Sequence, residues 1–286
     1  AFRANETLGF LRKPLEDLCI SRPKSRLSWG IELPFDKDYV CYVWFDALIN
    51  YISGVGYGSD DEKFNAWWPA SCHLIGKDIL TTHTVYWPTM LHAMGVDMPQ
   101  SIFAHGWWLT GREKMSKSLG NVINPMDMVD KCGVDAFRYY LLAAMAPGQD
   151  ASFTEESFVK RYNNDLANDL GNLLSRVVKM VSRSGGVIPE DGKAPEAPEK
   201  ELAAVVTAAV AAMEEAQVSM KLDQGIAAAM NAVRAGNRYL EKCAPWTLAK
   251  NGETERLNTV LYSAAHHANE WITSLVLLKF AEELAK

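Results

Sequence analysis

The stretch SCHLIGKDILTTHTVYWP, residues 71–88, decides the class of fold. Its first six residues form a short, largely apolar run, which is typical of a buried strand. The rest places large side chains every four positions, as on one face of a helix, at Ile79, His83 and Trp87. A strand followed directly by a helix predicts one unit of an α/β domain with a parallel sheet.

Two flanking segments extend this pattern. Residues 39–45, YVCYVWF, are β-branched and aromatic, which predicts a strand buried on both faces of a parallel sheet. A helix is expected to begin after it with Asp46 as its N-cap, and residues 101–106, SIFAHG, predict a third strand. Three side chains would then lie at the carboxyl end of the first strand, where open parallel sheets bind ligands: Trp44, Ala47 and Tyr51. From periodicity alone, these three residues are better explained as core than as pocket.

The second half of the chain has helical periodicity almost throughout, beginning at Thr154. Four segments carry this pattern: 158–183, 199–220, 222–243 and 253–286. A turn and linker rich in glycine and proline, residues 184–198, separates the first two. The connections are short, so this half is predicted to be an all-α bundle.

The composition is that of an ordinary globular protein, with 286 residues and a formal net charge of −6. The acidic balance argues against binding of nucleic acid by bulk charge, although a local basic or aromatic patch could still bind it. Five cysteines are scattered without a Cys-x-x-Cys pair, which favours reduced thiols in a cytoplasmic protein over a disulfide framework or a zinc knuckle. No apolar run is long enough to span a membrane. The first residues resemble no signal peptide. The chain begins with Ala1 and not with an initiator methionine, so we expect it to be a piece of a longer protein.

A polar loop bounded by glycines, GREKMSKSLGN at 111–121, follows the third predicted strand. Lys114 and Lys117 lie three positions apart, so the loop can place two cations around a polyphosphate. Met115 would be a buried anchor of the loop, while Ser116 and Ser118 could bond phosphate or fix the loop. A solvated basic turn is the ordinary alternative, but the run KMSKS between a strand and a helix favours a binding function.

Four stretches together make the chain resemble the methionyl-tRNA synthetases, a family of class I aminoacyl-tRNA synthetases. They are VWFDALINY at 43–51, GKDI through WP at 76–88, HGW at 105–107 leading into the KMSKS loop, and NLLSR at 172–176 together with PW at 245–246. The resemblance covers essentially the whole chain, and the first three stretches are specific to the methionine family. The loop alone would fit several class I relatives.

The resemblance implies a fold and a division into domains. The implied fold class is α/β plus all-α: the second half of a Rossmann-type parallel-sheet catalytic domain, followed by a helical-bundle anticodon-binding domain. The implied parts are the exit of a connective insertion at 1–33, the second half of the catalytic domain at 34–110, the signature loop and stem-contact region at 111–157, and the anticodon-binding domain at 158–286.

The family's substrate-binding residues map onto positions of this sequence. Those that match the methionine pocket are Trp44, Ala47, Tyr51, Ile79, His83 and Trp87. Those that match the ATP site are Lys77, His105, Gly106, Lys114, Met115, Ser116, Lys117 and Ser118, with Lys114 and Lys117 implied to be catalytic. A polarizable thioether suits an aromatic cavity, where a hydroxyl or imidazole can offer its sulfur a hydrogen bond. Asp46 and Asp78 stand where polar groups could orient substrate, and Leu48 stands where a proline is common in bacterial members.

Three residues match the family's readers of the CAU anticodon: Asn172, Arg176 and Trp246. Unstacked bases are recognised by hydrogen bonds to their edges and by stacking on aromatic or guanidinium planes, which suits these residue types. Without the resemblance, a surface salt bridge for Arg176 and a core role for Trp246 would be the better interpretations.

The implied reaction is ATP-dependent ligation of L-methionine to tRNA(Met) through a methionyl-adenylate. ATP with Mg²⁺ is the implied cofactor, and no protein-bound zinc or other metal is expected in this part. None of the six histidines belongs to the His-x-Gly-His motif that the class requires, so we expect a fragment that is inactive without the missing N-terminal portion of the enzyme. Two alternatives stay open: a class I synthetase for another apolar amino acid, and a non-catalytic tRNA- or protein-binding module derived from such a synthetase.

Overall fold

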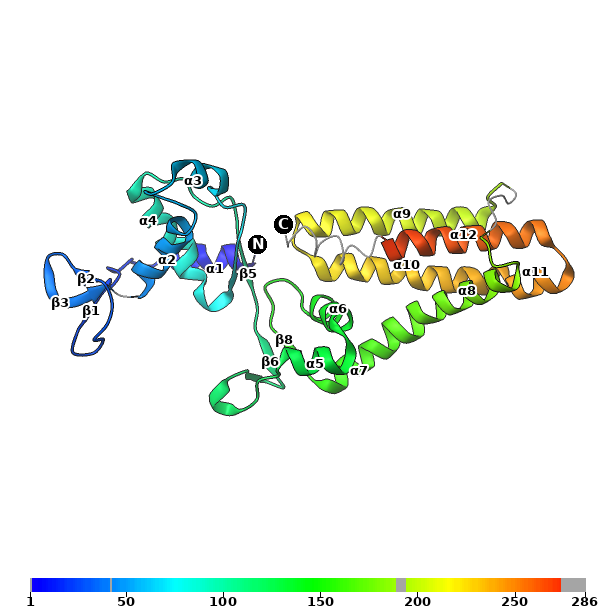
Figure 1. The fold of residues 1–286 in the computed structure, drawn as a ribbon, viewed down its shortest axis with the longest axis horizontal. Coiled ribbons are helices and arrows are strands. Elements are labelled where there is room, and N and C mark those ends of the chain that lie inside the picture. Colours follow the sequence, from blue (N-terminus) through cyan, green and yellow to red (C-terminus); the bar gives the residue numbers. More distant parts are fainter. Residues whose placement is uncertain (1, 42, 189–193, 274–286) are drawn as a thin grey trace. The chain divides into compact units, whose positions relative to one another are not determined.

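The computed structural model describes residues 2–41, 43–188 and 194–273. The chain divides into two compact units, Ala1–Trp107 and Trp108–Lys286, and each is described by itself (Figure 1). The predicted four-part division into domains stays a prediction. In the described part of the chain, no helix is long and apolar enough to cross a membrane.

The first unit mixes short strands with helices. Its elements are α1 (Phe2–Leu11), β1 (Ser21–Pro23), β2 (Glu32–Leu33), β3 (Asp36–Cys41), α2 (Val43–Ser53), α3 (Asp61–Trp67), β4 (His73–Gly76), the 3₁₀ turn η1 (Lys77–Ile79), the π-helical η2 (Thr82–Tyr86), α4 (Trp87–Met94) and β5 (Ile102–His105).

The strand predicted over 39–45 is wrong in its bounds and its partners. β3 ends at Cys41 and lies in an antiparallel sheet of order β1-β3-β2, where Val40 is its only buried side chain. Trp44 and Phe45 belong to the first turn of α2, because Leu48 and Ile52 continue an apolar stripe at helical spacing and are 1% and 0% exposed. Asp46 therefore lies in the first turn of α2 and is not its N-cap.

The other two predicted strands are confirmed as a parallel pair. β4 runs beside β5 in a register that sets His73 against Ile102 and Gly76 against His105. Helices α2 and α4 contribute a buried cluster formed by Leu48, Ile52, Trp87 and Leu91, with Trp68. The segment predicted as one helix after β4 instead passes through η1 and η2 before α4 begins at Trp87.

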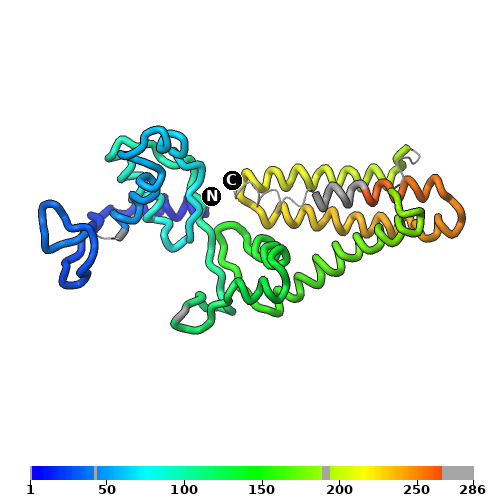
Figure 2. Tube along the Cα trace, viewed as in Figure 1, coloured from blue at the N-terminus to red at the C-terminus, as the bar shows by residue number. Residues whose placement is uncertain are grey.

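The second unit begins with a small sheet and continues as helices, whose coils can be followed along the trace in Figure 2. Its elements are β6 (Trp108–Thr110), β7 (Glu113–Lys114), the 3₁₀ turn η3 (Lys117–Leu119), α5 (Pro125–Cys132), α6 (Val134–Ala144), β8 (Ala151–Phe153), α7 (Glu155–Arg161), the π-helical η4 (Tyr162–Gly171), α8 (Asn172–Arg183), α9 (Ala197–Val218), α10 (Leu222–Cys243), α11 (Pro245–Asn251) and α12 (Thr254–Thr273). The sheet has the order β7-β6-β8, with β6 parallel to β8.

The predicted helical bundle is confirmed in the second unit. α9 and α10 run side by side with α12 (Figure 1), and a buried cluster joins them to α8 through Leu173, Val206, Val233 and Val260. α10 has the bounds predicted from the sequence, whereas the segment predicted over 253–286 begins as α12 at Thr254, and its residues 274–286 lie outside the described part. A Cβ on Gly236 would lie 3.0 Å from Leu173 Cδ2, so α10 and α8 approach closely there.

A buried carboxylate fixes the start of α9 against two other helices. Glu199 is 3% exposed, and its Oε2 accepts the backbone N–H of Glu196 at 2.9 Å, which closes a capping box. Its Oε1 accepts the Tyr239 hydroxyl at 2.7 Å from α10 and an Arg256 guanidinium N–H at 2.9 Å from α12. The carboxylate is therefore fully hydrogen-bonded, as a buried charge must be.

Candidate functional site

A chain of hydrogen bonds in the first unit orients His83, which is 2% exposed. Its Nδ1 lies 2.9 Å from the carbonyl oxygen of Ile79, and its Nε2 lies 2.9 Å from the hydroxyl of Tyr51. Because a carbonyl only accepts, Nδ1 donates, and in the neutral ring Nε2 then accepts the Tyr51 hydrogen. The single hydroxyl hydrogen of Tyr51 is therefore directed at His83.

Four of the six residues predicted to bind methionine contact one another: Trp44, Tyr51, His83 and Trp87. The ring of Tyr51 lies 5.9 Å from that of Trp87, centroid to centroid, and the ring of Trp44 meets His83 edge-on at 6.4 Å. Trp87 is fully buried, while Tyr51 is 37% exposed. Aromatic faces and one hydroxyl thus gather where α2, η2 and α4 meet.

The remaining two predicted methionine residues have other surroundings. Ile79 provides the carbonyl oxygen that fixes His83, while its side chain lies against the buried cluster of Ile75, Leu80 and Ala104. Ala47 lies on α2, one turn before Tyr51, and is half-buried.

The sequence analysis did not assign a role to His73, which the structure places in the same cluster. His73 is 5% exposed, and its Nε2 accepts the indole N–H of Trp87 at 3.1 Å. The ring of Tyr51 lies over it at 4.3 Å, centroid to centroid. Burial, and then the neighbouring His83, lowers the pKa of His73. The signal in the sequence was a histidine inside an otherwise apolar predicted strand.

Three residues predicted to bind ATP lie at the carboxyl ends of β4 and β5, which are adjacent parallel strands. They are Lys77, His105 and Gly106. The Lys77 ammonium lies 4.1 Å from the centroid of the Trp107 ring, and the Trp107 indole donates to Asp78 Oδ1 at 3.2 Å. A Cβ on Gly76 would lie 2.7 Å from that same Asp78 oxygen, so a larger residue there would displace this carboxylate.

The lysine loop lies in the second unit and is closed by Asn121. The Asn121 Oδ1 accepts the backbone N–H of Ser116 at 2.8 Å, and its Nδ2 donates to the Lys114 carbonyl at 3.3 Å. The hydroxyls of Ser116 and Ser118 are 2.7 Å apart. Met115 is half-buried against the cluster around Met128, which agrees with its predicted anchoring role.

The two predicted catalytic lysines differ in what the structure describes. Lys114 ends β7 and is exposed. Lys117 begins η3, but its side chain lies outside the described part. The predicted ATP residues outside this loop are Lys77, His105 and Gly106, which belong to the first unit.

The three residues predicted to read an anticodon lie on two helices of the second unit. Asn172 begins α8 and is exposed, and Arg176 follows one turn later. A guanidinium nitrogen of Arg176 lies 3.2 Å from Glu241 Oε1, an exposed ion pair. Trp246 is the second residue of α11 and is 46% exposed, so it is not a core residue.

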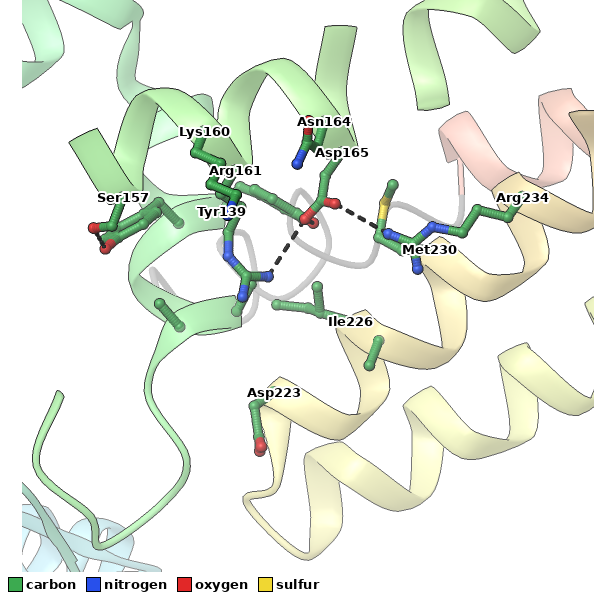
Figure 3. A pocket seen from close by; sticks show the side chains of 14 residues that line it. Tyr139, Ser157, Lys160, Arg161, Asn164, Asp165, Asp223, Ile226, Met230 and Arg234 are labelled. Carbon is green, nitrogen blue, oxygen red and sulfur yellow. Dashed lines mark hydrogen bonds and ion pairs between the residues drawn. The ribbon is translucent and has the colours of Figure 1, made fainter. Parts of the chain in front are cut away.

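A buried ionic network holds η4, just before α8, and the sequence analysis did not predict it. Asp165 is 8% exposed and accepts hydrogen bonds from the Tyr139 hydroxyl at 2.7 Å, from Arg161 at 3.3 Å and from Arg234 at 3.0 Å (Figure 3). Arg234 also contacts Asp169 Oδ2 at 2.7 Å. Burial and the Asp165 carboxylate raise the pKa of Tyr139.

The same network forms a wall of a cavity of ≈ 520 Å³ between α6, α7, η4 and α10. The guanidinium groups of Arg161 and Arg234 in this wall both contact Asp165, and Arg234 also contacts Asp169, so two carboxylates balance the two cations within the protein. None of the residues predicted from the sequence to bind substrate or RNA lines it. In the described part of the chain, no group of three or more His, Cys, Asp or Glu side chains could hold a metal ion.

Comparison with known proteins gives one consistent result. The family model described as tRNA synthetases class I (M) matches residues 2–178. Proteins named methionine–tRNA ligase are similar to the chain: that of Clostridium perfringens is 44% identical over 264 residues, and that of Bacillus subtilis is 41% identical over 282 residues. These alignments cover 91% and 97% of this chain, but 41% and 42% of the relatives, so the chain spans about two-fifths of their length.

A solved structure also matches. Mycobacterium tuberculosis methionyl-tRNA synthetase in complex with methionyl-adenylate superposes with a TM-score of 0.87 and 36% sequence identity. The match covers 94% of this chain and 53% of that one. The apo form of the same protein matches with a TM-score of 0.83 and 34% identity.

Proposed function

This chain belongs to the methionyl-tRNA synthetase family of class I aminoacyl-tRNA synthetases, and on that premise we propose that the protein containing it joins L-methionine to tRNA(Met). The reaction would use ATP, pass through a methionyl-adenylate and take place in the cytoplasm. The observation that carries the proposal is the cluster of Trp44, Tyr51, His83 and Trp87. A flexible thioether gains from contact with aromatic faces, which this cluster supplies.

In the proposed fold, the first unit carries the second half of a Rossmann-type catalytic domain. The parallel pair β4-β5 supports this, because ligands bind beyond the carboxyl ends of parallel strands and Lys77, His105 and Gly106 lie at that edge. The proposed domains remain 1–33, 34–110, 111–157 and 158–286.

The first step proposed is attack of the methionine carboxylate on the α-phosphorus of ATP, with pyrophosphate as the leaving group. Lys114 and Lys117 would stabilise the growing negative charge of pyrophosphate, with the loop held in shape by Asn121. Lys77, His105 and Gly106 would bind the nucleotide at the edge of the sheet. No covalent bond to the protein is needed, so positioning and charge stabilisation supply the catalysis.

Mg²⁺ would accompany ATP. This ion keeps much of its water shell and is bound through the substrate phosphates and only one or two carboxylates of the protein. Asp78 is the acidic side chain beside Lys77 and fits such a contact. The ion would neutralise part of the phosphate charge. The protein's own cations would complete that neutralisation.

In the second step, a hydroxyl at the 3′ end of tRNA(Met) would attack the adenylate carbonyl and form the ester, with AMP as the leaving group. The anticodon of this tRNA is proposed to bind at Asn172, Arg176 and Trp246. The exposure of Trp246 supports this, because an exposed indole next to a helix start can stack on an unpaired base. The ion pair of Arg176 with Glu241 is exposed and therefore weak, so it does not prevent the guanidinium from bonding a base.

The test is ATP–pyrophosphate exchange with the full-length protein that contains this chain, measured with a panel of apolar amino acids. Exchange should depend on methionine, and Lys117→Ala should lower it by about 10²-fold or more while leaving the circular-dichroism spectrum unchanged. Lys179→Ala, an exposed lysine on α8, is the matched control and should keep full exchange. Exchange driven by another amino acid, or full exchange in Lys117→Ala, would refute the assignment.

One observation keeps a second candidate function. Trp246 is exposed on α11, a position that would equally suit a non-catalytic tRNA- or protein-binding module derived from a class I synthetase, which is the alternative. Binding of tRNA(Met) without any exchange activity in the full-length protein would favour it.

A further inference from the structure

We propose that His73 is a positioning residue that holds the indole of Trp87 and thereby sets the depth of the pocket for the amino-acid side chain. The inference rests on the proposed function, because the pocket is that of the proposed methionine site. His73 itself would touch no substrate. It would act on selectivity through Trp87.

The hydrogen bond between Trp87 and His73 can run in one direction only. The indole nitrogen of Trp87 can only donate, and it lies 3.1 Å from His73 Nε2. His73 must therefore keep Nε2 unprotonated and carry its hydrogen on Nδ1. Trp87 is fully buried, so its N–H has lost water and needs this acceptor.

His73 is needed as a hydrogen-bond acceptor and not only as a ring that fills space. His73 also packs its ring at 4.3 Å from Tyr51 and at 6.0 Å from Trp68, centroid to centroid. A phenylalanine could fill this space, but it would leave the Trp87 N–H buried without a partner. The imidazole is thus required by its lone pair and not by its shape. Burial lowers the pKa of His73, which keeps the ring neutral and the lone pair available.

His73 is connected to the proposed pocket through Trp87 and Tyr51. Trp87 and Tyr51 both match the methionine-binding positions, and His73 contacts both. Tyr51 in turn bonds His83, so a shift of either ring reaches the whole cluster. A fixed Trp87 sets how long a side chain the cluster can accept, and one added methylene is discriminated by about 10- to 200-fold in tight pockets.

The experiment uses the full-length protein with His73→Phe and His73→Gln. Glutamine keeps an acceptor at about the reach of Nε2, whereas phenylalanine keeps only the ring. His92, an exposed histidine on α4, supplies the matched control His92→Phe. The measurements are the KM values for methionine and ATP in exchange, the ratio of kcat/KM for methionine over ethionine, and the indole ¹H–¹⁵N signal of Trp87, assigned with Trp87→Phe.

We expect His73→Phe to raise the methionine KM and to lower the methionine-to-ethionine ratio by about tenfold each, with the ATP KM unchanged. Its Trp87 indole hydrogen should exchange rapidly with solvent, whereas His73→Gln and His92→Phe should behave like the unsubstituted protein. Unchanged selectivity in His73→Phe overturns the inference, and so does an equal loss in His73→Gln with a raised ATP KM, which would mean packing alone. An unsubstituted protein without methionine-dependent exchange instead refutes the proposed function, and the inference falls with it.

Discussion

The Tyr51 hydroxyl has one hydrogen, and it donates this hydrogen to His83. His83 donates from Nδ1 to the Ile79 carbonyl and accepts at Nε2, so the order of the three groups is fixed by what each can donate. A thioether in this cluster would then be bound by aromatic faces and shape, while the hydroxyl holds His83 in place. For the Tyr51 hydroxyl to donate a hydrogen bond to the methionine sulfur, it would have to give up its bond to His83.

Tyr51→Phe tests this arrangement. The variant removes the donor to His83 but keeps the ring, so the KM values for methionine and for norleucine should rise by the same factor, about tenfold. Exchange kinetics with both amino acids measure it. Tyr57→Phe is the control, because the ring of Tyr57 lies against Phe64 and Tyr57 is not among the residues predicted to bind methionine. A loss confined to methionine would show that Tyr51 donates to sulfur.

Two helical irregularities explain why element bounds were harder to predict than element types. A spacing of four at Ile79, His83 and Trp87 exceeds the 3.6 residues of an α-helical turn, so these positions would drift around a regular helix. The wider turn of η2 accommodates the spacing and directs His83 at Tyr51. η4 has the same character and is held by Asp165. Sequence periodicity indicates a helix in both places but does not distinguish the type of turn.

The first turn of α9 carries a pH-dependent contribution to stability. Burial acts to raise the pKa of Glu199, but hydrogen bonds from Arg256, Tyr239 and the backbone of Glu196 outweigh it, so the pKa lies below its ordinary value of 4.5. A carboxyl group with a lowered pKa stabilises the fold above that value and loses this effect as the pH falls through its folded-state pKa.

Glu199→Gln should therefore cost about 1–3 kcal/mol of unfolding free energy at pH 7 and less than that at pH 3.5. Urea unfolding at the two pH values measures the difference. Glu201→Gln is the control, since Glu201 forms an exposed ion pair with Lys242 and should change stability by at most about 0.5 kcal/mol. A pH-independent cost for Glu199→Gln would contradict the role given to its charge.

Across the chain, the features predicted best from the sequence were helices and strands whose formation depends on residues close to one another along the chain. The bounds of α10 follow from continuous periodicity, and β4 and β5 follow from short apolar runs between helical segments. The run at 39–45 was misassigned because its β-branched and aromatic residues fit a strand, whereas burial of Leu48 and Ile52 favours a helix. Pairs such as Trp87 with His73, or Arg234 with Asp165, join separate elements that only the folded chain brings together, so no spacing rule predicts them.

The two proposed functions draw on different residues: anticodon binding on α8 and α11, and amino-acid activation on the methionine cluster, the carboxyl ends of β4 and β5, and the lysine loop. Trp246→Ala should therefore lower kcat/KM for charging of tRNA(Met) by about 10- to 100-fold, because one base loses its stacking partner, and leave ATP–pyrophosphate exchange unchanged. Both assays are run on the same preparation. Trp67→Ala, another exposed tryptophan, is the control and should charge tRNA normally. Equal losses in the two assays would mean that Trp246 is structural.

The close approach at Gly236 has a consequence for how inherited or selected variants of this protein are interpreted. A larger residue at this position displaces Leu173, which shares a turn of α8 with Asn172 and Arg176. A substitution of Gly236, which is not proposed to contact RNA, would then give the same phenotype as loss of a proposed anticodon-binding residue. That phenotype is normal amino-acid activation with failed charging of tRNA. A variant map based on distance from the ligand would classify it as benign, so the mutational footprint expected of the proposed anticodon site is wider than its contact surface.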